Sequence, residues 1–237
     1  MQLGRPHLHL QSIGSTNQRA RELAAAGAPH GTLVTADHQT AGRGRQGRDW
    51  VAPPGSSALI SVVLRDPPAL LPLIAAVAVA ESCGPQAQIK WPNDILIEDS
   101  QGRLGKVAGI LCEGRPQEGW GVVGIGINVA LDLDAAPEEI RTTAATLALE
   151  PSARRLIVAQ TVAALGAALL LPPDLILERW RQRDALAGSQ VSWQTAGGLQ
   201  HGTAIGVGGD GALRVESSDG EELELDGGEV HLEPAGD

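Results

Sequence analysis

A run of alternating glycines and arginines at residues 42–48 is the segment of this 237-residue chain whose composition most directly suggests chemistry. Its three glycines lack a Cβ, which lets the backbone approach a ligand closely. Its three arginines carry planar guanidinium groups, which match phosphate or carboxylate oxygens with two parallel hydrogen bonds. The run, called here the Arg/Gly loop, therefore predicts a phosphate-handling active-site loop of an ATP-using enzyme. An RGG-like contact with RNA is the alternative.

Lysine and asparagine are rare in this chain, and each copy falls in a segment with other chemically useful residues. The run Lys-Trp-Pro-Asn-Asp at 90–94 combines a cation, an aromatic ring, an amide and the carboxylate of Asp94. Pro-Asn-Asp is also common in ordinary turns, so a purely structural turn stays open. Lys106 stands in an otherwise apolar run, where its charge must reach an edge or meet a negative partner. The five copies are Lys90, Lys106, Asn17, Asn93 and Asn128.

Two further segments suggest ligand contacts. The two glycines in the run Gly-Ile-Gly-Ile-Asn at 124–128 lack side chains, which lets a flat ligand lie close to the strand. Asn128 offers the hydrogen-bond donor and acceptor that suit an adenine edge. Ser15 is typical of a helix N-cap, with Gln18 as its reciprocal capping-box partner. Capping does not exclude ligand contacts at the same helix N-terminus.

Composition and charge restrict the class of protein. The hydrophobic content of 43% supports an ordinary globular core, and the formal net charge of −10 argues against nonspecific nucleic-acid binding. The most apolar stretch, 69–80, is shorter than the roughly twenty residues of a membrane span. Cys83 and Cys112 form no disulfide framework, and histidines such as His201 lack metal-ligand spacing, so the sequence identifies no metal ligands. We expect a cytoplasmic protein.

The elements that must position these residues follow from the apolar patterns and the turn residues. Consecutive hairpins after residue 88 predict antiparallel pairing rather than a regular βαβ alternation. Short strands and Gly-rich turns from residue 188 predict a small β-barrel. We expect helices at 15–26, 67–84, 152–170 and 174–187, and strands at 31–37, 57–64, 88–91, 95–98, 104–113, 120–129, 190–193, 199–207, 213–216 and 221–225, with a turn at 99–102.

Taken together, these segments closely resemble the biotin–protein ligase family in residues, order and spacing. The resemblance is strong from about residue 12 to residue 129 and loose beyond. Gln46 departs from it, because some members carry another arginine there. The resemblance implies an α+β fold, with a mixed, mainly antiparallel sheet flanked by helices as in class II aminoacyl-tRNA synthetases. It also implies a small C-terminal SH3-like barrel, and hence domains at 1–187 and 188–237.

The resemblance also implies roles for individual positions. Lys106, Arg43, Arg45 and Asp94 would be catalytic, with Asp94 orienting the acceptor lysine. Biotin would be bound by Ser15, Thr16, Asn17, Gln39, Arg43, Gly44, Arg45 and Lys106. ATP would be bound by Arg45, Arg48, Trp50, Lys90 and Asn128.

The implied reaction joins biotin to ATP, giving biotinyl-5′-AMP and pyrophosphate, and then transfers biotin to a lysine of a biotin carboxyl carrier protein. Mg²⁺ would accompany ATP. Ordering the seven residues of the Arg/Gly loop costs on the order of 7–14 kcal/mol, so the loop should be mobile until both ligands arrive.

Some family members also carry an N-terminal winged helix that binds DNA. Here the catalytic pattern begins within the first fifteen residues, so we expect no DNA-binding domain. A homodimer is common in the family. A lipoate or octanoate ligase or transferase of related fold, and a noncatalytic RNA-binding protein, are the alternative functions.

Overall fold

The computed structural model describes residues 3–99, 102–195 and 197–233. A seven-stranded sheet forms its larger part, in the order β1-β2-β3-β7-β6-β5-β4. The pair β1–β2 is parallel, and the other neighbouring pairs are antiparallel. The strands are β1 (His7–Ile13), β2 (Leu33–Gln39), β3 (Ser57–Arg65), β4 (Gln88–Lys90), β5 (Asp94–Glu98), β6 (Leu104–Arg115) and β7 (Trp120–Asn128).

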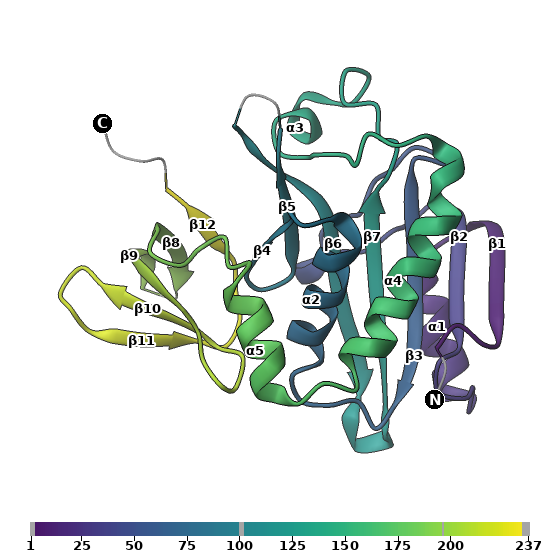
Figure 1. Cartoon of the computed structure of the whole chain (residues 1–237), viewed down its shortest axis with the longest axis horizontal. Helices are drawn as coiled ribbons and strands as arrows, with labels where there is room; N and C mark the ends of the chain where they lie inside the picture. The colour runs from purple at the N-terminus through teal and green to yellow at the C-terminus, as the bar shows by residue number, and fades with distance from the viewer. Residues whose placement is uncertain (1–2, 100–101, 196, 234–237) are drawn as a thin grey trace.

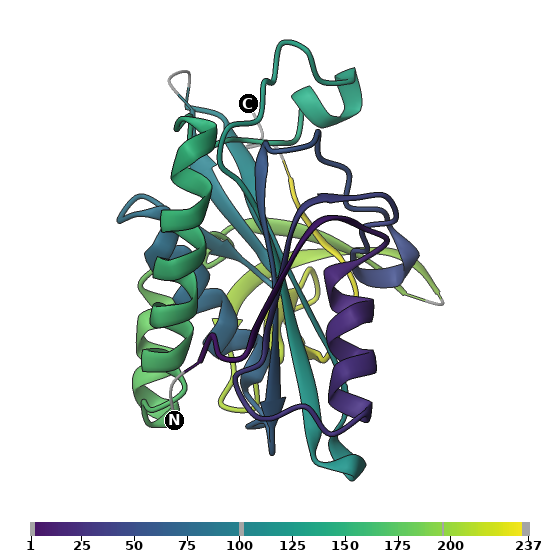
Figure 2. The same ribbon diagram turned by 90° about the vertical axis from the view of Figure 1, so that its right-hand side faces the viewer.

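Helices cover both faces of this sheet (Figures 1 and 2). Helix α1 packs on one face over β3 and β7, while α2 and α4 pack together on the other. The continuous apolar runs of β3 and β7 follow from this arrangement, because strands covered on both faces bury every side chain. The helices are α1 (Thr16–Ala25), α2 (Leu71–Cys83), α3 (Glu138–Arg141), α4 (Arg154–Ala168) and α5 (Pro173–Arg181).

A second, five-stranded antiparallel sheet lies beside α5 and β4 (Figure 1). Its links to the larger sheet include the bridge from Asp184, between α5 and β8, to Ile89 of β4, and the bond that Trp91 Nε1 donates to the Gly211 carbonyl at 3.1 Å. Its strands are β8 (Gln190–Thr195), β9 (Gly198–Val207), β10 (Leu213–Ser217), β11 (Glu222–Leu225) and β12 (Val230–Leu232). The predicted boundary between residues 187 and 188 stays a prediction.

The predicted mixed, mainly antiparallel sheet with flanking helices is confirmed. The order of the four strands after residue 88 is also as expected. The turn at 99–102 includes residues 100 and 101, which lie outside the described residues, but β5 and β6 on either side pair antiparallel. None of the helices within the described ranges is long and apolar enough to cross a membrane.

Several elements differ from the expectation. Helix α2 begins at Leu71 instead of Pro67, because residues 68–71 first form a turn in which Leu71 N donates to the Pro68 carbonyl at 3.1 Å. Helix α5 ends at Arg181 instead of 187, since the chain leaves the helix to pair Asp184 with Ile89. Strand β1, helix α3 and strand β12 were not predicted.

Candidate active site

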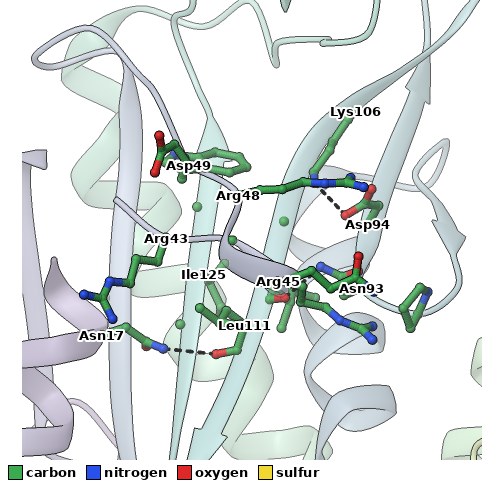
Figure 3. A pocket seen from close by; sticks show the side chains of 18 of the residues that line it. Asn17, Arg43, Arg45, Arg48, Asp49, Asn93, Asp94, Lys106, Leu111 and Ile125 are labelled. Carbon is green, nitrogen blue, oxygen red and sulfur yellow. Dashed lines mark hydrogen bonds and ion pairs between the residues drawn. The ribbon is translucent and has the colours of Figure 1, made fainter. Parts of the chain in front are cut away.

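A pocket of about 930 Å³, counting the space at its open mouth, lies where the Arg/Gly loop crosses the seven-stranded sheet. Strands β3, β5, β6 and β7 supply part of its wall, and the N-terminus of α1 supplies one end. Figure 3 shows Asn17 and the Asp94–Lys106 pair on opposite sides of the pocket. Of the predicted site residues, those that line the pocket are Ser15, Thr16, Asn17, Gln39, Arg43, Gly44, Arg45, Arg48, Trp50, Lys90, Asp94 and Lys106.

The Arg/Gly loop folds back on itself over this pocket. Gly44 N donates to the Arg48 carbonyl at 2.7 Å, and Trp50 N donates to the Gly42 carbonyl at 3.0 Å. Arg43 and Asp49 form an antiparallel bridge across the same turn. Gln46 at the tip has φ 54, in the left-handed region, so the residue that departs from the family pattern also occupies a strained backbone position. The loop thus brings Arg43, Arg45 and Arg48 to one pocket.

Lys106 meets the negative partner that its position in an apolar strand requires. Its Nζ lies 2.6 Å from Asp94 Oδ1, from the neighbouring strand β5 (Figure 3). The same Nζ lies 5.8 Å from the centroid of the Trp50 ring. Both members of the pair are mostly shielded from solvent, which strengthens their attraction relative to a surface pair.

The pocket carries an excess of positive charge. Burial is the main cause that lowers the pKa of Lys90. The nearby Asp94 raises that pKa, and the positive charges of Lys106 and Arg48 lower it further. Burial also lowers the pKa of Arg45, against the opposing effects of Asp94 and Cys112. Both shifts express the cost of partly desolvating a cation, and for Lys90 also the cost of holding it near two other cations. An anion in this pocket would relieve that cost.

The glycines of the run 124–128 accommodate flat groups, and in this structure those groups belong to the protein itself. A Cβ on Gly126 would lie 2.5 Å from Trp50 Cε2, and a Cβ on Gly109 would lie 3.0 Å from Trp50 Cζ3. A Cβ on Gly124 would lie 2.3 Å from Asn17 Oδ1. The expectation of a ligand directly against these glycines therefore needs revision, because two pocket side chains lie there.

Asn128 does not line the pocket. It is 5% exposed, its Oδ1 accepts from Ser57 Oγ at 3.2 Å, and its Nδ2 donates to the Ala145 carbonyl at 3.0 Å. These bonds tie β7 to β3 and to the segment after α3. The adenine contact expected of Asn128 stays a prediction, since its side chain is engaged inside the protein.

Three residues that sequence reasoning missed belong to this site or touch it. Ser61 lines the pocket from the middle of β3, as the single hydroxyl within the apolar run 58–64. Glu113, near the end of β6, accepts from Asn17 Nδ2 at 2.6 Å. Glu229 comes from the connection between β11 and β12 and pairs with Arg48. Only Ser61 carried a sequence signal, an isolated polar residue in a buried strand.

Within the described ranges, no three side chains of His, Cys, Asp or Glu lie together so that they could hold a metal ion. Of the carboxylates that line the pocket, Asp94 faces Lys106 and Glu229 faces Arg48, while Asp49 stands on the exposed Arg/Gly loop. A resident cation would have to displace these partners. The described side chains therefore do not fit a protein-held metal site, and a divalent cation would enter on a phosphate ligand.

The comparisons with known proteins agree with this geometry. Residues 10–130 match the model of the biotin/lipoate A/B protein ligase family. The chain is 33% identical over 247 residues to the bifunctional ligase/repressor BirA of Bacillus spizizenii, an alignment that covers 92% of this chain and 71% of that relative. It is 35% identical over 239 residues to the biotin–[acetyl-CoA-carboxylase] ligase of Paracoccus denitrificans, covering 90% of this chain and 95% of that relative.

The fold has a similar counterpart among solved structures. The biotin protein ligase from Aquifex aeolicus in complex with biotin and ATP matches with a TM-score of 0.79 and 25% sequence identity. The match covers 98% of this chain and 100% of that one. The family expected from the sequence motifs is thereby confirmed. This chain belongs to the biotin/lipoate A/B protein ligase family.

Proposed function

We propose that this protein is an ATP-dependent biotin–protein ligase. It activates biotin with ATP to biotinyl-5′-AMP and pyrophosphate, and then transfers biotin to a lysine of a biotin carboxyl carrier protein. The observation that carries the proposal is one pocket lined by both a charged group of side chains and a buried polar group. Relatives named as biotin–[acetyl-CoA-carboxylase] ligases, and a similar structure holding biotin and ATP, support this assignment.

The charged side suits the first step. A biotin carboxylate must attack the α-phosphate of ATP, which brings two anions together. Arg43, Arg45 and Lys106 line the pocket and would offset that repulsion and stabilise charge on the phosphoryl oxygens. In this step the ammonium group of Lys106 would turn from Asp94 to the reacting oxygens. We assign Arg48, Trp50 and Lys90 to ATP, while Asn128 would need to leave its internal bonds to reach adenine.

The uncharged side suits the ring system of biotin. Ser15, Thr16 and Asn17 are each at most 5% exposed, and Gln39 joins them through bonds to Thr16. Buried donors and acceptors of this kind discriminate strongly between a ligand that satisfies them and one that does not. A bicyclic urea satisfies them, and an apolar ring leaves them unpaired.

The second step needs a neutral amine on the carrier lysine. With an ordinary pKa near 10.4, well under about 1% of such a lysine is neutral at pH 7. When Lys106 turns to the substrate, Asp94 loses its cation and becomes available to orient or deprotonate the incoming amine. The mixed anhydride hydrolyses in water, so closure of the Arg/Gly loop would protect it.

We treat ATP as entering with Mg²⁺ on its phosphates, so the cation is part of the substrate. We place the reaction in the cytoplasm. A homodimer stays a prediction that sedimentation of the purified chain would test. The absence of a DNA-binding function also stays a prediction, which an electrophoretic shift assay of the purified chain with duplex DNA would test.

The direct test is ATP–pyrophosphate exchange with purified protein. We expect exchange that depends on biotin and does not respond to lipoate or octanoate. Exchange driven by lipoate would favour the related ligase. Salt-sensitive RNA binding without biotin binding would favour an RNA-binding role for the Arg/Gly loop.

A further inference from the structure

Five polar side chains from four elements form one continuous hydrogen-bonded ladder along the uncharged side of the pocket. Thr16 Oγ1 donates to Gln39 Oε1 at 2.9 Å, and Ser61 Oγ lies 2.9 Å from Thr16 Oγ1 and 3.1 Å from Asn17 Oδ1. Asn17 Nδ2 then donates to Glu113 Oε2 at 2.6 Å. The first four members line the pocket, and Glu113 stands behind Asn17.

Glu113 is held in place by the same helix that carries Asn17. Arg21 Nη1 donates to Glu113 Oε1 at 2.9 Å. Asn17 and Arg21 are four residues apart on α1, so their side chains lie on one face of the helix. The two residues therefore donate to different oxygens of the Glu113 carboxylate, near the end of β6.

The ladder has a direction, and Glu113 sets it. An ionised carboxylate can only accept hydrogen bonds, whereas a primary amide has a donor side and an acceptor side. Because Nδ2 of Asn17 must face Glu113, its Oδ1 must face Ser61. Ser61 has one proton to donate, and its hydroxyl lies within donor distance of both Asn17 Oδ1 and Thr16 Oγ1, so the two acceptors share that proton.

Asn17 has little freedom other than reversal of its amide. The side chain is 5% exposed, and a Cβ on Gly124 would come within 2.3 Å of its Oδ1. Its Nδ2 also approaches the Leu111 carbonyl at 3.4 Å (Figure 3). Reversal would leave the shape of the pocket unchanged and replace an acceptor with a donor. Glu113 therefore controls whether Asn17 presents an acceptor or a donor at this wall, without changing how the side chain packs.

The opposite end of the ladder is fixed as well. Gln39 Oε1 accepts from both the backbone N and the hydroxyl of Thr16, at 2.7 and 2.9 Å. Its Nε2 is thereby directed away from Thr16, as a donor. The wall thus offers one amide donor and several acceptors, which complements a cyclic urea with one carbonyl and two N–H groups. A dithiolane ring has neither group.

We propose that Glu113 is a positioning residue that fixes the amide of Asn17 and so makes the pocket selective for a cyclic urea. This inference rests on the proposed ligase function and names the feature that separates biotin from lipoate within it. Glu113 acts through Asn17 and does not itself line the main pocket.

The test is calorimetric binding of biotin, ATP and lipoate to the full chain and four variants. Glu113→Gln lets the neighbouring amide reverse, and we expect biotin Kd to rise about tenfold or more, as for loss of a hydrogen bond to a charged group. ATP Kd should stay within about twofold. The matched control is Glu22→Gln, which removes a carboxylate paired with Arg19 at 2.9 Å on the exposed side of α1 and should change neither constant.

Moving the carboxylate from position 113 to position 17 distinguishes a positioning role of Glu113 from general damage to the structure. Asn17→Asp alone faces Glu113 with a second carboxylate and should weaken biotin binding most. The double variant Asn17→Asp with Glu113→Gln restores one donor opposite one acceptor and keeps an acceptor toward Ser61. We expect it to bind biotin at least about tenfold more tightly than Asn17→Asp alone.

Each result decides the inference. Unchanged biotin affinity in Glu113→Gln, equal weakening of biotin and ATP, or no recovery in the double variant would overturn it while leaving the ligase function intact. If the unmodified protein binds lipoate instead of biotin, or neither, the proposed function fails and the inference fails with it. Should Glu113→Gln not fold, Arg21→Gln releases the same carboxylate from the exposed side, and a biotin-specific loss there is the expected outcome.

Discussion

Asp94 and Lys106 form an ion pair across strands β5 and β6, with 2.6 Å between Oδ1 and Nζ. Each is the nearest opposite charge available to the other, so the pair is neutral before substrate arrives. The two residues have different proposed tasks, one in adenylation and one in transfer. We therefore propose that the pair links the two steps, with Lys106 turning toward the reacting oxygens first and Asp94 facing the incoming amine afterwards.

Lys106→Ala should strongly reduce adenylation, while Asp94→Ala should mainly impair transfer. Removing one charge-stabilising donor from an active site costs about 10²–10³ in rate, so we expect a loss of that order in ATP–pyrophosphate exchange for Lys106→Ala. Asp94→Ala should reduce biotin transfer to a carrier protein more than exchange. Arg115→Ala, an exposed arginine paired with Glu118, is the control. Equal losses in both assays for Asp94→Ala would contradict this division of labour.

Trp50 should leave its place when Gly126 gains a side chain. The Cβ of Gly126→Ala would lie 2.5 Å from Trp50 Cε2, far inside van der Waals contact. Because Trp50 is assigned to ATP, the KM for ATP should rise while melting temperature changes little. The control is Gly209→Ala, since a Cβ on Gly209 meets nothing within 4 Å.

Acrylamide quenching reports the same displacement directly. The other four tryptophans, Trp91, Trp120, Trp180 and Trp193, are each at most 4% exposed. Added quenching in Gly126→Ala therefore comes from Trp50. Quenching identical to that of the unmodified protein would mean that the indole does not depend on Gly126.

Glu229, the residue before β12, should compete with ATP for Arg48. The two side chains form an ion pair at the pocket rim, and burial, Lys90 and Arg48 together lower the pKa of the neighbouring His231. Glu229→Gln frees Arg48, and because an exposed pair contributes up to about 1 kcal/mol, KM for ATP should fall by about two- to fivefold. Glu233→Gln, which faces His201 on the same sheet, should leave KM unchanged. A rise in KM for Glu229→Gln would mean that Glu229 supports ATP binding.

The sequence was sufficient to predict those parts of the fold and site that are local in the chain. Strands β3 and β7 are continuous apolar runs, and the Arg/Gly loop and Lys106 stand out by composition alone. Strand β1 was missed because its residues alternate between exposed and half-buried and include two histidines.

The missed site residues depend on contacts between distant segments. Glu113 meets Asn17 at a separation of 96 residues, and Glu229 meets Arg48 at 181. Neither glutamate has an unusual neighbour in sequence. Likewise, the glycines of β7 predicted a flat group, but only the packed structure places Trp50 and Asn17 against them.

The Arg/Gly loop should be cleaved by trypsin less readily once biotin and ATP are both bound. Arg43, Arg45 and Arg48 are trypsin sites, and besides short backbone bonds within the turn the loop is tied across the pocket by the rim contact of Arg48 with Glu229. Anionic ligands would add contacts to all three arginines and offset the entropy of ordering the loop. Limited proteolysis followed by mass spectrometry should show protection at these sites with both ligands, weaker protection with either alone, and unchanged cleavage at the exposed Arg141 of α3. Cleavage at the loop that is insensitive to both ligands together would mean that the loop does not close over them.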